Sequence, residues 1–323
     1  MDAIRWDGNT LHLLDQRALP TQKAWIRCDD WTQVVQAIEH MVVRGAPAIA
    51  ITAAYGMALA IQQNADRQVV ERSLLASRPT AVNLRWSLER LATIPNEQVE
   101  DEAIRIHNED RAICKAIGDH GAQFLDGGVI TICNTGALAT GGQGTALGMV
   151  RTAITKGQSL HLYVLETRPY LQGARLTATE CIEDGIPFTL VADSMAGTLM
   201  AKGDINAVVV GCDRVARNGD TANKIGTYSL AVLAHHHAIP FYVAMPLSTL
   251  DTTTLTGRDI PIEERSAEEL CRVGATTIAP ETTPVWNPAF DITPAHLITA
   301  WVTEKGLWVP PNHAPLDVIH RNR

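Results

Sequence analysis

Short apolar runs alternate with amphipathic stretches through the second half of the chain. Runs of strand character cover Val129–Cys133, His161–Glu166, Pro187–Asp193, Val208–Val210 and Pro240–Met245. Helical patterns lie between them, beginning near Thr145 and covering Arg175–Asp184, Met195–Lys202 and Ile225–Ala234. Strands that alternate with helices at this spacing are typical of βαβ units, so we predict a doubly wound α/β fold with a parallel sheet.

The first 120 or so residues have a mainly helical pattern after a short β segment. Asp7-Gly8-Asn9 separates the apolar pieces IRW and LHLL and predicts a hairpin. The predicted helices cover Trp31–Val43, the small-residue-rich run after Pro47, the stretch from Asn83 to Leu91, and Glu97–Ala122. We therefore expect a smaller, mainly helical domain at residues 1–122 and an α/β domain at residues 123–323. Within the latter, the prolines after Ile278 predict short elements and loops.

Charge and composition disfavour several classes of protein. The 323 residues carry a formal net charge of −8 and contain no basic run, so we expect neither nucleic acid nor membrane as a partner. The six cysteines are scattered without a CxxC pair, as is usual for reduced thiols in a cytoplasmic protein. The N-terminal residues lack a signal-peptide pattern, and the most apolar helical run, Ala46–Ile61, is too short to span a bilayer.

The segment Gly211–Thr227 has the highest density of candidate chemistry. It places Asp213 shortly after an apolar predicted strand, and Asn218-Gly219-Asp220 predicts a turn. We expect Asn223 and Lys224 to begin the next helix. A carboxyl, an amide and an ammonium group at the carboxyl end of a parallel strand could serve a small anionic substrate. An ordinary strand–loop–helix connection would account for the same residues.

Polar residues follow nearly every predicted strand of the second half. They include Cys133-Asn134-Thr135, Glu166-Thr167-Arg168, Asp193-Ser194, Asp213 and Ser248-Thr249. Because parallel strands end at the same edge of a sheet, we expect these side chains to gather at one crevice. Cys133 precedes a Gly-rich loop and a predicted helix, where a thiol could act as an acid or a base. A buried structural cysteine is the alternative.

Three cations are candidates for binding an anion. Arg44 and Arg78 each stand in a loop before a helix of the first domain, and guanidinium groups suit phosphate geometry. Lys224, from the second domain, would complete the site, whereas ordinary surface arginines are the alternative. The loop at Gly141–Thr145 could also hold phosphate through backbone N–H groups. It is neither GxGxxG nor a P-loop, so it gives little support to nucleotide binding.

Other kinds of site lack their sequence patterns. His235, His236 and His237 are consecutive on a predicted helix and point in different directions, so they cannot bind one metal together. We see no other metal-ligand spacing and predict no metal. Neither the GxSxG of serine hydrolases nor a GxGxxG after a strand is present, which disfavours hydrolase and dinucleotide-dependent dehydrogenase chemistry.

Long motifs in a fixed order cover nearly the whole chain. They are VVRGAPAIAITAAYGMALA, SRPTAVNLRWSLERL, CNTGALATGGQGTALGMVR, ETRPYLQGARLTATE, DSMAG, the run that begins GCDRVARNGDTANKIGT, IPIEER and NPAFDITPAHLITAWVTEKG. They resemble the motifs of 5-methylthioribose-1-phosphate isomerases. Their superfamily includes ribose-1,5-bisphosphate isomerases and regulatory subunits of the eukaryotic translation-initiation guanine-nucleotide exchange factor. The resemblance implies a cofactor-free homodimer with a Rossmann-like domain, acting in methionine salvage.

The resemblance also implies which residues form the site. It places the catalytic pair on Cys133 and Asp213, and it places the substrate contacts on Arg44, Gly45, Ala46, Arg78, Gln172, Asn223 and Lys224. Gln172 has no independent signal in the residue pattern. Two positions differ from the family pattern, because Ile132 stands where a histidine is usual and Gln143 where an aromatic residue is usual.

The reaction that the resemblance implies converts 5-methylthioribose 1-phosphate, an aldose phosphorylated at its anomeric carbon, to 5-methylthioribulose 1-phosphate. Because of Gln143, 5-deoxyribose 1-phosphate stays open as a substrate, as does ribose 1,5-bisphosphate. A non-catalytic, exchange-factor-like regulatory subunit is the alternative from another class. The presence of both Cys133 and Asp213 favours the enzyme, since a purely regulatory subunit needs no acid–base pair.

Overall fold

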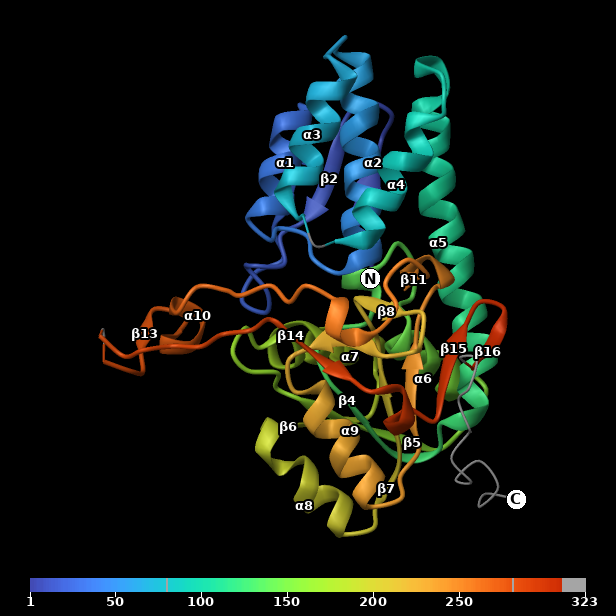
Figure 1. The fold of residues 1–323 in the computed structure, drawn as a ribbon, viewed down its shortest axis with the longest axis vertical. Helices are drawn as coiled ribbons and strands as arrows, with labels where there is room; N and C mark the ends of the chain where they lie inside the picture. Colours follow the sequence, from blue (N-terminus) through green and yellow to red (C-terminus); the bar gives the residue numbers. More distant parts are fainter. Residues whose placement is uncertain (80, 281, 310–323) are drawn as a thin grey trace.

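Two parts of the chain differ in architecture, as the residue pattern predicts (Figure 1). The structure, a computed structural model, describes residues 1–79, 81–280 and 282–309. Its α-helices are α1 (Trp31–Glu39), α2 (Ala46–Gln62), α3 (Arg67–Ser77), α4 (Val82–Ala92), α5 (Val99–Gly121), α6 (Ala146–Thr155), α7 (Ala178–Asp184), α8 (Ala196–Ala201), α9 (Thr227–His236) and α10 (Glu268–Cys271). The longer strands are β1 (Ile4–Trp6), β2 (Leu11–Leu14), β3 (Trp25–Cys28), β4 (Gly127–Thr131), β5 (Leu160–Leu165), β6 (Phe188–Val191), β7 (Ile205–Val210), β8 (Arg214–Ala216), β9 (Thr221–Lys224), β10 (Phe241–Ala244), β14 (Phe290–Thr293), β15 (Ala300–Thr303) and β16 (Gly306–Trp308). The two-residue strands are β11 (Leu250–Asp251), β12 (Arg272–Val273) and β13 (Thr276–Thr277).

The N-terminal part packs four helices and the first half of α5 against the small antiparallel sheet β1–β2–β3. The predicted hairpin is confirmed, with Ile4 opposite Leu13. Helix α2 is buried on nearly all sides, and its small residues allow neighbouring helices to pack closely around it. Pro47 lies in the first turn of α2, where its missing N–H has no partner to lose.

The main sheet has the strand order β16-β15-β10-β7-β4-β5-β6. Its strands are parallel except β16, which runs antiparallel to β15. Helices α5, α6 and α7 contribute to the core on one face, and α8 and α9 to the core on the other. Coverage of both faces explains why the predicted strands are almost continuously apolar. The predicted doubly wound α/β fold is therefore confirmed.

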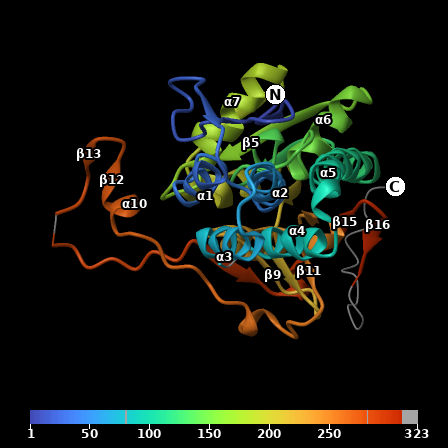
Figure 2. The same ribbon diagram turned by 90° about the horizontal axis from the view of Figure 1, so that it is seen from above.

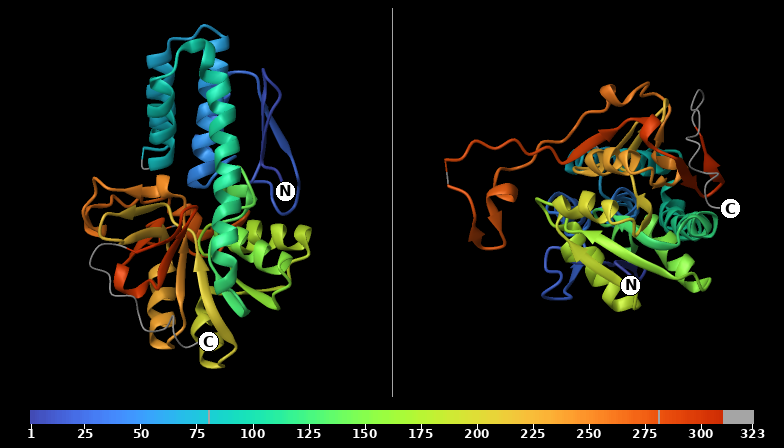
Figure 3. Two further views of the ribbon diagram at one scale, coloured as in Figure 1. Left: turned by 90° about the vertical axis from the view of Figure 1, so that its right-hand side faces the viewer. Right: turned by 90° about the horizontal axis from the view of Figure 1, so that it is seen from below.

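Helix α5 connects the two parts of the molecule, as the side view shows (Figure 3). Its residues Val99, Ala103 and Ile106 belong to the N-terminal core, whereas Ile117 belongs to the core of the main sheet. A helix of 23 residues is about 34 Å long, enough to reach both cores. The proposed domain boundary after residue 122 stays a prediction, because α5, which ends just before it, packs in the cores of both parts.

A second sheet, of order β11-β8-β9-β14, corrects one prediction. Asn223 and Lys224 do not begin a helix but end strand β9, and α9 begins at Thr227. The predicted turn at Asn218–Asp220 is present, and it joins β8 to β9 as an antiparallel hairpin. Strand β9 also pairs with β14, which is formed nearly 70 residues later. That long-range pairing overrides the helical pattern.

The last third of the described chain contains elements that the residue pattern did not resolve. β15 and β16 extend the main sheet, and the segment with α10, β12 and β13 projects away from the molecule, as the view from above shows (Figure 2). The predicted loops after residue 309 lie outside the described residues. Within the described ranges, no helix combines the length and apolarity needed to cross a membrane.

Candidate active site

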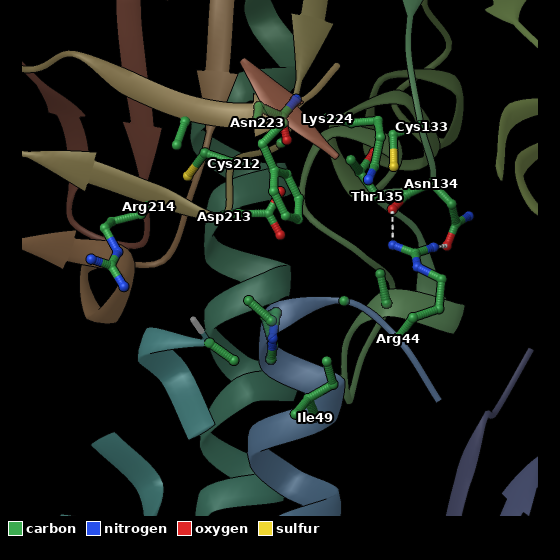
Figure 4. A pocket seen from close by; sticks show the side chains of 18 of the residues that line it. Arg44, Ile49, Cys133, Asn134, Thr135, Cys212, Asp213, Arg214, Asn223 and Lys224 are labelled. Atoms are coloured by element: carbon green, nitrogen blue, oxygen red, sulfur yellow. Dashed lines mark hydrogen bonds between the residues drawn. The ribbon is translucent and has the colours of Figure 1, made fainter. Parts of the chain in front are cut away.

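The direction of chain progression reverses between β4 and β7. From β4 the chain continues through β5 and β6 on one side, and β7, β10 and β15 follow on the other. The crevice outside the carboxyl ends at such a switch point is where doubly wound sheets bind ligands. Cys133 follows β4, Asp213 follows β7, and both border one cavity at this position (Figure 4).

The cavity brings together all nine residues of the expected site. It holds about 1120 Å³ of empty space, open solvent at its mouth included. Its border contains the expected residues Arg44, Gly45, Ala46, Arg78, Cys133, Gln172, Asp213, Asn223 and Lys224. The first four come from the helical part and the other five from the α/β part, so the cavity lies between the two.

Cys133 adopts a left-handed backbone conformation, with φ of 66°. Strand β4 ends at Thr131, two residues before the end of the predicted strand, and Cys133 lies in the bend beyond it. Its N–H donates to the hydroxyl of Thr167 at 2.8 Å, and its carbonyl accepts from the hydroxyl of Thr177 at 2.6 Å. Such a conformation is unfavourable for a residue with a Cβ, and it persists where neighbouring groups fix it. The two threonines therefore fix the direction of the thiol.

Asp213 is placed by the β8–β9 hairpin, since its N–H donates to the carbonyl of Ala222 at 2.9 Å. Burial raises the pKa of the Asp213 carboxyl, whereas the nearby charges of Lys224 and Arg44 act in the opposite direction. The carboxyl group therefore holds its proton to a higher pH than an exposed aspartate does, which suits a group that exchanges protons with a substrate.

Lys224 points into the same space as Cys133 and Asp213 (Figure 4). Its ammonium donates to the carbonyl of Ala289 at 2.8 Å and lies 4.3 Å from the centre of the Phe290 ring. Burial lowers the pKa of Lys224 to about 8. Lys224 is thus mostly protonated at neutral pH, and it loses its charge when the pH rises above about 8.

Arg44 is oriented by Asn134, which was expected at this edge of the sheet but without a role in the site. The guanidinium group donates to the side-chain oxygen of Asn134 at 2.9 Å and to its carbonyl at 3.0 Å. The Asn134 amide in turn donates to Glu180 at 2.7 Å, and Glu180 is paired with Arg151. This chain of polar contacts ties the arginine of the helical part to the residue that follows Cys133.

Gln172 supplies a buried polar atom without a partner. Its Oε1 is inaccessible and accepts no hydrogen bond from the residues that the structure describes. Buried polar atoms are nearly always paired, so an unpaired oxygen in a residue on the cavity border makes Gln172 a candidate for contact with a ligand. Gly45 and Ala46 lie at the N-terminus of α2, where N–H groups lack partners within the helix and favour anions.

Of the Gly-rich loop Gly141–Thr145, only Thr145 is on the cavity border, so the glycines that were expected to hold phosphate do not line it. The N–H of Gly141 donates to the buried carboxyl of Asp110 at 2.6 Å instead. Gln143 also lies away from the cavity, and its amide donates to the hydroxyl of Thr152 at 3.1 Å. Ile132 is buried in the core of the sheet. Neither departure from the family pattern therefore changes the residues that line the cavity.

Other candidate groups are separate from this cavity. His235, His236 and His237 lie at the end of α9 and the position after it. Among the described residues, no group of three or more His, Cys, Asp or Glu side chains is arranged to hold a metal ion. The guanidinium group of Arg214, although it borders the cavity, points away from Cys133 (Figure 4) and lies 3.7 Å from Asp251.

The sequence and the structure both have relatives among known proteins. Residues 42–310 match the Initiation factor 2 subunit family. A protein of Alcanivorax borkumensis named methylthioribose-1-phosphate isomerase is 54% identical, and the alignment covers 98% of this chain and 96% of the relative. The crystal structure of 5-methylthioribose 1-phosphate isomerase from Pyrococcus horikoshii OT3 has a TM-score of 0.89 at 40% identity, with coverage of 96% and 93%.

A second solved structure has a different description. The structure described as translation initiation factor eIF-2B, subunit delta, from A. fulgidus has a TM-score of 0.83 at 42% identity, and 96% of each chain is covered. The switch-point cavity, the Rossmann-like sheet and these matches define the class, an α/β protein of the Initiation factor 2 subunit family. Within this class, the chain belongs to the methylthioribose-1-phosphate isomerase family.

Proposed function

We propose that this protein converts 5-methylthioribose 1-phosphate to 5-methylthioribulose 1-phosphate, with Cys133 and Asp213 as the acid–base pair. The observation that carries the proposal is the position of these two residues. They follow adjacent strands, β4 and β7, and they border one cavity that also contains guanidinium groups. The name of the relative from A. borkumensis is that of the same activity.

In the proposed complex, the phosphate group is bound from both parts of the molecule. Arg44 and Arg78 approach from the helical part and Lys224 from the α/β part. Planar guanidinium groups bind phosphate oxygens through pairs of N–H groups, and the N-terminus of α2 adds backbone N–H groups. Gln172 and Asn223 would then bind the hydroxyl groups of the sugar.

The reaction begins with ring opening, because C1 is locked in the ring as an acetal. The bond from C1 to the ring oxygen breaks as that oxygen gains a proton, which leaves C1 electron-poor. In one route a base removes the C2 proton and a proton is returned to C1. In the other, hydrogen moves from C2 to C1 with its electron pair. Both routes end when the C2 hydroxyl proton is lost and the ketone forms.

Asp213 suits the proton transfers at the oxygen atoms, because burial raises its pKa and the carboxyl group then holds a proton more readily than an exposed aspartate does. Cys133 would exchange the carbon-bound proton in the first route. In the second route, the apolar residues Met41, Ile49 and Ile262 on the cavity border would protect the migrating hydride from water. In both routes the oxidation at C2 is balanced by the reduction at C1, so no external oxidant or reductant is consumed.

The substituent at C5 is tested by comparing substrates. The apolar part of the cavity border suits a methylthio group better than a second phosphate group. We expect the highest kcat/KM for 5-methylthioribose 1-phosphate, a lower value for 5-deoxyribose 1-phosphate and the lowest for ribose 1,5-bisphosphate. Turnover of the bisphosphate alone would contradict the proposed substrate.

The two routes are distinguished by a reaction in deuterated water. Deuterium at C1 of the product would support the proton-transfer route, and its absence would support the hydride shift.

A regulatory, non-catalytic function is the second candidate, favoured by the relative described as an initiation factor subunit. Turnover and subunit composition of the purified protein distinguish the enzyme from the regulatory subunit. Turnover by a stable homodimer, which the family resemblance leads us to expect, supports the enzyme. Obligatory co-purification with other subunits, without turnover, supports the regulatory function.

A further inference from the structure

A further guanidinium group borders the cavity, that of Arg265 in the IPIEER motif, to which neither the charge pattern nor the family resemblance assigned a role. Arg265 lies in the connection before α10, and its side chain is only 10% exposed. Its Nε donates to Glu263 at 3.0 Å and one Nη to Glu269 at 3.4 Å. The side chain is therefore fixed by carboxylates and does not extend into solvent.

Glu263 joins this arginine to another one. Its second carboxylate oxygen accepts from Nη2 of Arg78 at 3.3 Å, while the first accepts from Arg265. Arg78 comes from the connection between α3 and α4, 185 residues away from Glu263. One carboxylate thus holds two guanidinium groups together at the boundary of the two parts. Each guanidinium has five N–H donors, so donors remain for a second anion.

The excess of positive charge on the cavity border also favours the binding of an anion. Among the described residues on this border, the cations are Arg44, Arg78, Arg214, Lys224 and Arg265, and the one carboxyl group is that of Asp213. Glu263 and Asp251 offset part of this charge from behind the border. Burial lowers the pKa of Arg78, and Glu263 opposes the shift while Arg265 adds to it. A buried cation excess of this kind is stabilised by a multiply charged anion such as phosphate.

We propose that Arg265 binds the phosphate group of the substrate and that Glu263 is the positioning residue that holds Arg265 and Arg78 side by side for it. The identity of the phosphate ester rests on the proposed function. The anion-binding part does not, because inorganic phosphate carries the same recognised group.

The first test replaces the arginine and uses an exposed arginine as its control. Arg265→Gln should raise KM for 5-methylthioribose 1-phosphate and the inhibition constant of inorganic phosphate about 10- to 100-fold each, with kcat changed much less. Arg265→Lys should give constants between those of the wild type and those of Arg265→Gln, because an ammonium keeps the charge but cannot reproduce the planar donor pattern. Arg272→Gln, at an exposed position of β12, should leave both constants unchanged. Unchanged constants in Arg265→Gln would overturn the proposal.

The second test compares neighbouring carboxylates. Glu263→Gln should raise the same two constants about three- to tenfold, because both guanidinium groups lose their fixed orientation. Glu264→Gln is the matched control, since Glu264 accepts instead from the exposed Trp286 indole at 3.2 Å. A lower inhibition constant for phosphate in Glu263→Gln would show that this carboxylate competes with the ligand, and it would overturn the positioning role.

Thermal unfolding keeps this test independent of turnover. Inorganic phosphate should raise the Tm of the wild-type protein and of Arg272→Gln, and it should raise that of Arg265→Gln or Arg265→Lys clearly less. Equal increases in all variants, or none in the wild type, would contradict the phosphate site. If the wild type binds phosphate through Arg265 but does not isomerise the sugar phosphate, the proposed function fails and this inference stands.

Discussion

Arg44 donates two hydrogen bonds to Asn134, one to the side-chain oxygen at 2.9 Å and one to the backbone carbonyl at 3.0 Å. The pair joins the loop before α2 to the residue directly after Cys133. The proposed phosphate ligand Arg44 is therefore held by the neighbour of the proposed catalytic residue Cys133, although Arg44 and Asn134 are 90 positions apart.

Asn134→Ala tests this coupling. The variant removes one of the two acceptors of Arg44 and the donor to Glu180, so the arginine loses its fixed orientation. We expect KM to rise about tenfold, since a hydrogen bond to a charged group is worth roughly 1.5–3 kcal/mol. Asn108→Ala, which removes an exposed Arg–Asn contact, is the control for KM. Equal KM values in both variants would show that Asn134 does not orient Arg44.

The proposed catalytic pair is tested by two conservative substitutions. Cys133→Ser and Asp213→Asn each keep the size of the side chain, and each should lower kcat about 10²- to 10⁴-fold, the usual contribution of a general acid or base. Substrate should still bind, as measured by calorimetry. Near-normal turnover in either variant would remove that residue from the mechanism.

The charge of Lys224 predicts the alkaline side of the pH profile. Its pKa, lowered to about 8, means that the ammonium is charged below this pH and neutral above it. The attraction of Lys224 for phosphate is therefore present below about pH 8 and lost above it, so kcat/KM should fall as the pH rises through that value. Ionisation of the substrate phosphate lies near pH ~6 and cannot cause this fall.

Lys224→Arg provides the control for that profile, because a guanidinium stays charged throughout the range. Its kcat/KM, even if lower, should not decline between about pH 7.5 and 9.5. If the variant and the wild type lose activity at the same alkaline pH, another group is responsible.

The conformation of Cys133 depends on the buried hydroxyl of Thr167. Thr167→Val keeps the shape but leaves the Cys133 N–H without an acceptor, at a cost of roughly 1–3 kcal/mol in the free energy of unfolding. We also expect a lower kcat, because the thiol is no longer held in its direction. Thr167→Ser retains the hydroxyl and should be close to wild type in urea titrations and in turnover. Identical behaviour of both variants would argue against this role.

The sequence predicted the alternation of strands and helices in the α/β part, because the strands of a parallel sheet are buried on both faces and are therefore almost continuously apolar. It also predicted that polar side chains would gather at one edge. Asn223 and Lys224 were assigned to the wrong element, since the strand they end is fixed by pairing with β14. Local periodicity cannot detect a partner so far along the chain.

The site was predicted less completely from the residues themselves. The Gly-rich loop has the composition of a phosphate loop, but the buried Asp110 takes the Gly141 N–H, a contact that no motif encodes. Arg265 depends for its position on Glu263, which also binds the distant Arg78. Gln172 becomes noticeable only when its buried oxygen is seen to lack a partner.

The β8–β9 hairpin holds Asp213 just before one arm and Lys224 at the end of the other, with Arg217 and Asn218 exposed at its tip. The length of the two strands sets the distance between the Asp213 carboxyl and the Lys224 ammonium. Residue exchanges at the tip leave that spacing intact, whereas one residue inserted into either arm would shift the pairing and turn Lys224 to the opposite side of the sheet. Natural variation should therefore accumulate at the tip, and insertions there should be tolerated far better than in the arms.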